Sequence, residues 1–159
     1  MISFPKEHHK FLKQNVDPIE KGDYLVNAEV KNGLFLSDLV SNHLFIVFLS
    51  TSCSACEAAF EAIDSVLQTN PKLNTCFLID TDLQNLNAIK EALPNQNMIF
   101  SFPYNKMNET FGFARAPWGI AVNKELQIIS SGPFGKIETL DRMLKPFKYQ
   151  IGEIIESQK

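Results

Sequence analysis

The sequence lacks the features that mark several large classes of protein. Its three cysteines are few and odd in number, which argues against a small secreted domain held together by several disulfides. No apolar run approaches the roughly 18 residues that would span a bilayer, and the polar residues 1–22 contain no signal-peptide core. The net charge of −3 argues against a nucleic-acid or anionic-membrane partner. With 159 residues and no internal repeat or linker, the chain is expected to be one domain, 23–159, preceded by an irregular arm, 1–22.

The most informative stretch is 44–56, where a buried strand leads into two closely spaced cysteines. Residues 44–49 are an aromatic and β-branched apolar run, which is typical of a strand buried on both faces. Three hydroxyl residues at 50–52 then offer side-chain oxygens that can cap a helix. Cys53 and Cys56 follow with two residues between them, and a helical pattern begins at Glu57.

This order of elements predicts redox chemistry at the cysteine pair. The partial positive charge of a helix N-terminus stabilises a thiolate on the first cysteine. One helical turn then holds the second sulfur close enough to close a disulfide. We therefore predict that Cys53 is the attacking thiol and Cys56 the resolving thiol, with no cofactor, because electrons pass to or from the dithiol of another protein. The remaining cysteine, Cys76, lies in a strand-like run and is interpreted as a small buried hydrophobe.

Hydrophobic periodicity predicts alternating strands and helices along the rest of the chain. The expected strands are a hairpin at 23–36 with a tight Asn32-Gly33 turn, then 44–49, 73–79, 98–102, 119–122 and 126–131. The expected helices are a capped turn at 37–40, then 55–68, 82–93, 105–113 and 136–147. Residues 149–159 either extend the last helix or fray. In the helix at 82–93, the residues expected to point inward are Leu83, Leu86, Ile89, Ala92 and Leu93. Strand–helix alternation predicts crossover units on a central sheet, so the fold class is α/β with a mixed sheet between helices.

Several stretches resemble the thioredoxin fold and, within it, the TlpA/ResA/MauD branch of thiol–disulfide oxidoreductases. The hairpin at 24–36 and the residues 33–39 are similar to the opening of that branch. The segment 49–56, Leu-Ser-Thr-Ser-Cys-Ser-Ala-Cys, resembles the MauD-like active site. The segment 116–122, Ala-Pro-Trp-Gly-Ile-Ala-Val, is similar to the family's strand that begins at a cis-proline facing the disulfide, and Gly132 matches the glycine after the last strand.

The resemblance implies a thioredoxin-like three-layer α/β/α sandwich with an added N-terminal β-hairpin. It also implies a cis bond between Ala116 and Pro117, and substrate binding by Ala116, Pro117 and Trp118. The partners would be proteins that carry a dithiol or a disulfide. The location would be the extracytoplasmic side of a bacterial membrane, with an anchor or signal outside this chain; the cytoplasm is the alternative.

Departures from the family pattern leave the direction of electron flow open. Ser52 replaces the common Trp before the first cysteine, and the common Pro inside the motif is absent. Glu57 places a negative charge near the helix start and opposes thiolate formation at Cys53. Arg115 is interpreted as a solvated loop residue. Oxidant, reductant and isomerase therefore all remain possible roles for this pair.

Other classes fit the sequence less well. A non-catalytic thioredoxin-like module would dock a partner through its many phenylalanines, 13 in all, while the cysteines form a structural link. A peroxiredoxin-type peroxidase would carry a proline where Ile46 stands. Zinc needs four ligands, and neither Cys76 nor the three early histidines are at ligand spacing, so no metal site is predicted. A copper carrier would need a histidine after His43, and none follows.

Overall fold

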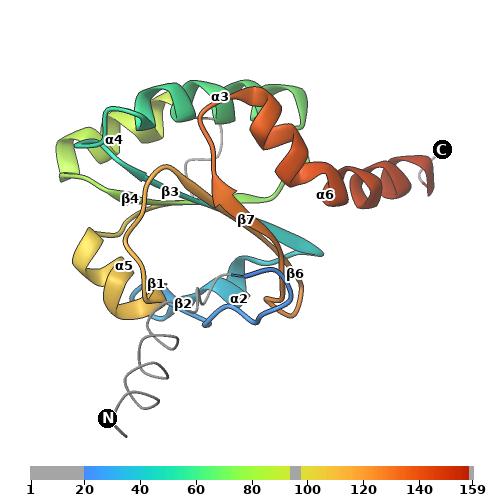
Figure 1. Ribbon diagram of the computed structural model, residues 1–159, viewed down its shortest axis with the longest axis horizontal. Helices are drawn as coiled ribbons and strands as arrows, with labels where there is room; N and C mark the ends of the chain where they lie inside the picture. The colour runs from blue at the N-terminus through green and yellow to red at the C-terminus, as the bar shows by residue number, and fades with distance from the viewer. Residues whose placement is uncertain (1–19, 94–97, 158–159) are drawn as a thin grey trace, which may run out of the picture.

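The computed structural model describes residues 20–93 and 98–157, with side chains as far as Phe147. The arm predicted at 1–22 lies almost wholly outside the described residues, and the domain boundary at residue 23 stays a prediction. The described residues form a sheet enclosed by two outer layers (Figure 1).

The sheet has five strands, which are β3 (His43–Ser50), β4 (Thr75–Asp80), β5 (Ile99–Ser101), β6 (Trp118–Asn123) and β7 (Ile128–Pro133). Their order across the sheet is β5-β4-β3-β6-β7. The first three run parallel, whereas β6 pairs antiparallel with β3 and β7 pairs antiparallel with β6. The mixed sheet predicted from the sequence is therefore confirmed, and β3 occupies its centre.

Helices cover both faces of this sheet (Figure 1). One face carries α3 (Cys56–Thr69), α4 (Leu83–Ala92) and α6 (Ile137–Ser157). The other carries α5 (Tyr104–Phe111), the single turn α2 (Leu36–Leu39) and the antiparallel hairpin of β1 (Glu29–Lys31) and β2 (Leu34–Phe35). Gly33 supplies the positive φ, +77°, that the tight hairpin turn needs. The predicted three-layer α/β/α sandwich with an added hairpin is confirmed.

The alternation of side chains along β3 builds one core on each face. All eight residues of the strand are buried. Phe45, Val47 and Leu49 pack beneath α3 and α6, whereas the residues between them pack against α5 and the hairpin. Nine of the 13 phenylalanines are buried in these two cores, so the described structure uses most of its aromatic content for packing rather than for an exposed surface.

Three residues depart from the sequence-based expectations. Leu83 and Ala92, expected to point inward, are both exposed, Leu83 to 72%, because Leu86 is the residue of α4 that is buried against the sheet. Helix α6 continues through Pro146 to Ser157, so it extends past residue 147, which is one of the two outcomes expected for residues 149–159. Gly132 lies within β7, opposite Gly119 of β6, rather than after the last strand.

Candidate active site

The cysteine pair lies where the central strand passes into α3, as the sequence predicts. After β3 ends at Ser50, a tight turn follows in which the Cys53 amide donates to the Ser50 carbonyl at 3.3 Å. A second turn brings the Cys56 amide to the Cys53 carbonyl at 3.2 Å, and α3 begins at Cys56. The hydroxyl capping expected from residues 50–52 is wrong, because the N-cap residue is Ala55 and no side chain caps the helix.

The two sulfurs lie in different environments. Cys53 is half-buried and Cys56 is buried, and both are thiols. The pKa of Cys56 is raised to about 12, mainly by burial and also by a hydrogen bond with the Cys53 side chain, while a hydrogen bond with the Ser50 backbone opposes the shift. Cys56 therefore stays protonated at neutral pH, and the accessible sulfur of the pair is Cys53. This arrangement suits an outer nucleophile and an inner thiol that can close a disulfide with it.

The loop that holds the predicted proline faces the outer sulfur. The Ala116–Pro117 peptide bond is cis. The Cys53 thiol donates to the Ala116 carbonyl at 3.4 Å across 63 residues of sequence. Ala116 also packs beside Cys53 at the edge of the core beneath α3. The structure thus brings Cys53, Cys56 and the Ala116–Pro117 peptide together at one edge of the sheet.

Trp118 turns away from this cluster. Its side chain packs with the core on the opposite face of the sheet, where its indole nitrogen donates to Ser131 Oγ at 3.0 Å. The Arg115 guanidinium lies over the indole, 5.2 Å from the ring centroid. Phe134, which follows β7, is also buried in the core. A direct role of Trp118 in substrate binding stays a prediction, and its contacts suit support of the proline loop from behind.

A polar cluster that sequence reasoning missed lies beside the pair. The buried Ser50 hydroxyl contacts Asp80 Oδ2 at 3.1 Å and Ser52 Oγ at 2.9 Å, and it accepts from the Ser52 amide at 3.2 Å. Tyr104 of α5 also lies beside Ser50. Burial raises the pKa of Tyr104, and the nearby Cys53, Cys56 and Asp80 raise it further. Ser50 therefore joins the turn before Cys53 to the end of β4 and to α5.

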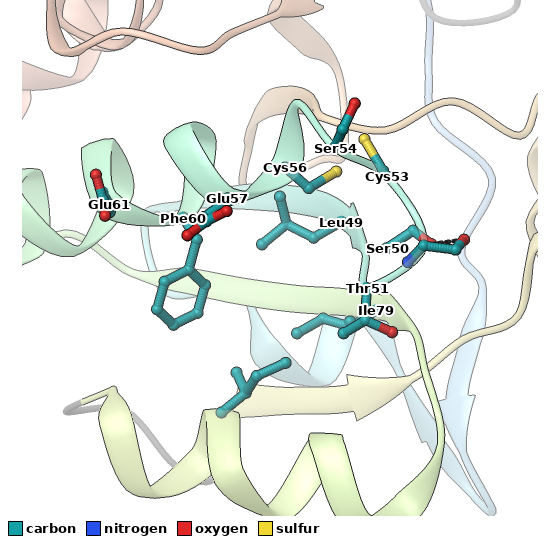
Figure 2. Close-up of a pocket in the computed structure, with 12 residues that line it drawn as sticks. Leu49, Ser50, Thr51, Cys53, Ser54, Cys56, Glu57, Phe60, Glu61 and Ile79 are labelled. Atoms are coloured by element: carbon teal, nitrogen blue, oxygen red, sulfur yellow. Dashed lines mark hydrogen bonds between the residues drawn. The ribbon is translucent and has the colours of Figure 1, made fainter.

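An apolar groove opens beside the cysteines, with a cavity volume of about 660 Å³. Leu49 and Ile79 contribute from β3 and β4, Phe60 from α3 and Ile89 from α4. Figure 2 shows Phe60 pointing from α3 toward α4, with the two cysteines at the start of the helix. The turn 50–54 forms one end of the groove, and two glutamates of α3 complete its lining. A partner that reached Cys53 would meet this groove directly.

Within residues 20–93 and 98–157, no group of three or more His, Cys, Asp or Glu side chains is arranged to hold a metal ion. None of the helices in the described part of the chain is long and apolar enough to cross a membrane.

The fold defined by this sheet, its helices and the cis-proline loop is thioredoxin-like. The sequence matches no protein-family model, and no curated protein shows significant similarity to it. Solved structures share the fold at low identity. The pneumococcal exposed lipoprotein thioredoxin of Streptococcus pneumoniae is 19% identical, with a TM-score of 0.55 over 71% of this chain and 90% of that one.

Two further solved structures carry related descriptions. A thiol:disulfide interchange protein from Bacteroides sp. is 13% identical, with a TM-score of 0.57 over 80% of this chain and 91% of that one. A DsbF homologue from Corynebacterium diphtheriae is 14% identical, with a TM-score of 0.51 over 71% of this chain and 76% of that one. These similarities establish the fold, and the chemistry of this chain is argued from its own residues.

Proposed function

We propose that this chain is a thiol–disulfide oxidoreductase that exchanges disulfides with partner proteins through Cys53 and Cys56. One observation carries the proposal: a half-buried thiol and a buried thiol lie one turn apart at the start of a helix, facing a cis-proline peptide. Among the structural neighbours, one is described as a thioredoxin and another as a thiol:disulfide interchange protein, which supports the same reading. No cofactor is needed, because the dithiol itself carries the two electrons.

The reaction balances in two steps. The Cys53 thiolate attacks one sulfur of the partner disulfide, so a mixed disulfide forms and the partner's other sulfur leaves as a thiolate. Cys56 then attacks the Cys53 sulfur and gives its proton to the solvent or to the departing thiolate. The partner is released as a dithiol, and the Cys53–Cys56 pair is oxidised by two electrons. The reverse sequence places a disulfide in the partner.

The proline loop has a proposed place in both directions. The Ala116 carbonyl lies within hydrogen-bond distance of the Cys53 sulfur, so Ala116 and Pro117 form the surface that a partner backbone meets as it approaches. Trp118 supports this loop from the opposite face through its bond to Ser131. We assign substrate binding to these three residues, the first two by contact and the third by positioning.

We also propose a finer family assignment for this chain. The N-terminal hairpin and the segment 49–56 support membership of the TlpA/ResA/MauD branch. That branch and the exposed lipoprotein among the structural neighbours favour the extracytoplasmic side of a bacterial membrane. An anchor outside the given chain would hold the domain there.

Reduction of the insulin disulfides, with dithiothreitol as the electron source, tests the enzyme against a non-catalytic module. Wild-type protein should accelerate the reaction, and Cys53→Ser should return it to the uncatalysed rate. Cys76→Ala is the matched control, because it removes a buried cysteine outside the pair and should retain the activity. If wild type and Cys53→Ser behave alike and neither turns over, the enzyme proposal is wrong and a binding role remains.

The reduction potential of the pair would give the direction of electron flow. A reduction potential of about −270 mV would favour a reductant, and a potential of about −120 mV would favour an oxidant.

A further inference from the structure

The groove beside Cys53 combines an apolar floor with an acidic rim. Its floor consists of Leu49, Ile79, Phe60 and Ile89, of which the last two are only partly buried. A groove of about 660 Å³ has room for one or two large side chains. Because it begins at the outer sulfur, whatever occupies it is held next to the reacting atom.

The rim has a single sign of charge. Glu57 and Glu61 are both exposed and lie four residues apart on α3, so they share one face of that helix. They are the charged residues among the described residues that line the groove, and no Lys, Arg or His joins them there. Two like charges at this spacing repel each other, and no described side chain makes an ion pair with either. A cation supplied from outside would relieve this repulsion.

The geometry sets the spacing of that cation from the reacting cysteine. Cys53 lies in the turn directly before α3, and from the first residue of the helix, Cys56, to Glu61 the helix rises about 7.5 Å at about 1.5 Å per residue. An extended partner chain covers that distance in two or three residues, at about 3.3 Å each. A basic residue two or three positions from the partner's cysteine would therefore reach the two glutamates, while an apolar neighbour fills the groove.

We propose that the groove selects partner segments in which the reacting cysteine is followed or preceded, within about three residues, by a large apolar residue and a Lys or Arg. This inference rests on the proposed function, because it concerns the partner of the same sulfur. The apolar floor supplies affinity through burial. The acidic rim supplies selectivity and speeds the encounter of cationic segments.

The test uses short peptides whose single cysteine is joined in a disulfide to a chromogenic aryl thiol. The Cys53 thiolate attacks the peptide sulfur and releases the coloured aryl thiolate, so the rate is read directly. Three peptides share one length: one carries Leu and Lys beside the cysteine, one Leu and Glu, and one Ser and Lys. Each rate is divided by that of a small neutral disulfide under the same conditions.

At low salt, the Leu and Lys peptide should react about tenfold faster than the Leu and Glu peptide, and the difference should shrink as salt screens the rim. Replacing Leu by Ser should slow the reaction several-fold. The variant Glu61→Lys should remove or reverse the preference for Lys. Glu91→Lys is the matched control, because it makes the same charge change at an exposed position of α4 that does not line the groove.

The possible failures point to different conclusions. Equal rates for all three peptides, or a preference for Lys that Glu61→Lys and Glu91→Lys alter equally, would overturn this inference alone. Absence of exchange with any disulfide, including the small neutral one, would overturn the proposed function as well. The salt dependence of the wild-type preference tests the charge argument even if Glu61→Lys fails to fold.

Discussion

The two ends of β3 both bury a polar side chain, His43 at the start and Ser50 at the end, but the surroundings of the two side chains differ. At the start of the strand, His43 Nε2 accepts from the Asn74 amide at 3.0 Å, and the Asn74 side chain donates to the carbonyls of His43 and Leu39. The imidazole also packs on Phe147, with ring centroids 4.7 Å apart. These bonds join β3 to the loop before β4 and to α6. The hydrogen bonds of His43 and Asn74 link these two residues to each other and to Leu39. Neither His43 nor Asn74 lines the groove beside the cysteines.

At the other end of the same strand, the buried polar groups lie beside the accessible sulfur of Cys53. Ser50 bonds to Asp80 and Ser52, and Tyr104 lies close to Ser50 and to both cysteines. The difference shows that buried polarity alone does not mark a functional site. What distinguishes the Ser50 end is its position beside a half-buried sulfur and an open groove. Substitutions at the two ends of β3 should therefore separate effects on stability from effects on the exchange reaction.

The largest expected effect is on the exchange reaction, at the Ser50 end of β3 beside the cysteines. With Cys56→Ser, the mixed disulfide on Cys53 has no intramolecular thiol to resolve it, so it should persist at least about a hundredfold longer. Thermal stability should change little. Mass spectrometry of the trapped species after mixing with a disulfide-bonded protein measures this. Resolution at the wild-type rate would show that Cys56 does not act on the mixed disulfide.

At the opposite end, the expected loss is one of stability. His43→Ala removes a buried ring and leaves the Asn74 amide without its acceptor, which should cost about 2–4 kcal/mol of unfolding free energy. Below the melting transition, the exchange rate should stay within about twofold of wild type. Urea unfolding and insulin reduction on the same samples give the two values. If activity fell far more than the folded fraction, the two ends of β3 would not be separable.

Ser50→Ala should give an intermediate result, with both effects at once. Loss of the hydroxyl leaves Asp80 and Ser52 short of a partner, which should cost about 1 kcal/mol. The turn before Cys53 also loosens, so the exchange rate should fall about threefold to tenfold. Ser65→Ala, at an exposed position of α3, is the matched control. An unchanged rate in Ser50→Ala would make this cluster purely structural, like the His43 end.

Part of this architecture is readable from sequence, and part depends on strand register. The apolar run of β3, the cysteine spacing and the segment after Pro117 each predict a local feature that the structure contains. Ser50 and Asp80 stand 30 residues apart, and they meet only because the parallel register pairs them across β3 and β4. Tyr104 is brought in from α5 on the other side of the sheet, so no local pattern points to it.

The same dependence on tertiary packing explains which sequence-based predictions were wrong. Leu83 fits the helical period of its segment, but α4 is buried through Leu86 and leaves Leu83 exposed. The three hydroxyl residues at 50–52 fit a capping pattern, but an extra turn separates them from α3 and puts Ala55 at the cap. His43 and Asn74 have no signal in the sequence, because their bond depends on how the loop before β4 lies against β3.

The smallest effect is a pH dependence that belongs to the His43 end. Burial lowers the pKa of His43 below 6.5, and the Asn74 amide that donates to Nε2 requires the neutral ring. Below pH 6.5 the unfolded chain therefore binds a proton that the folded chain refuses, so the unfolding free energy falls as the pH drops toward the lower folded pKa. Above pH 6.5 this contribution is fully present.

His43→Phe removes the titrating group, so its stability should depend less steeply on pH between about 5 and 7 than that of wild type. Urea unfolding at several pH values measures the two slopes, and other titrating groups cancel in the difference. Equal slopes would show that His43 titrates alike in the folded and unfolded chains.

The central claim is that Cys53 and Cys56 form one reversible two-electron couple. Equilibration of the whole chain in glutathione buffers of graded potential, followed by acid quenching and peptide mass mapping, tests it directly. We predict a single transition in which a peptide linking Cys53 to Cys56 appears with the loss of two hydrogens, while Cys76 stays a thiol. Cysteines that remain reduced throughout, or that acquire only separate glutathione adducts, would contradict the account.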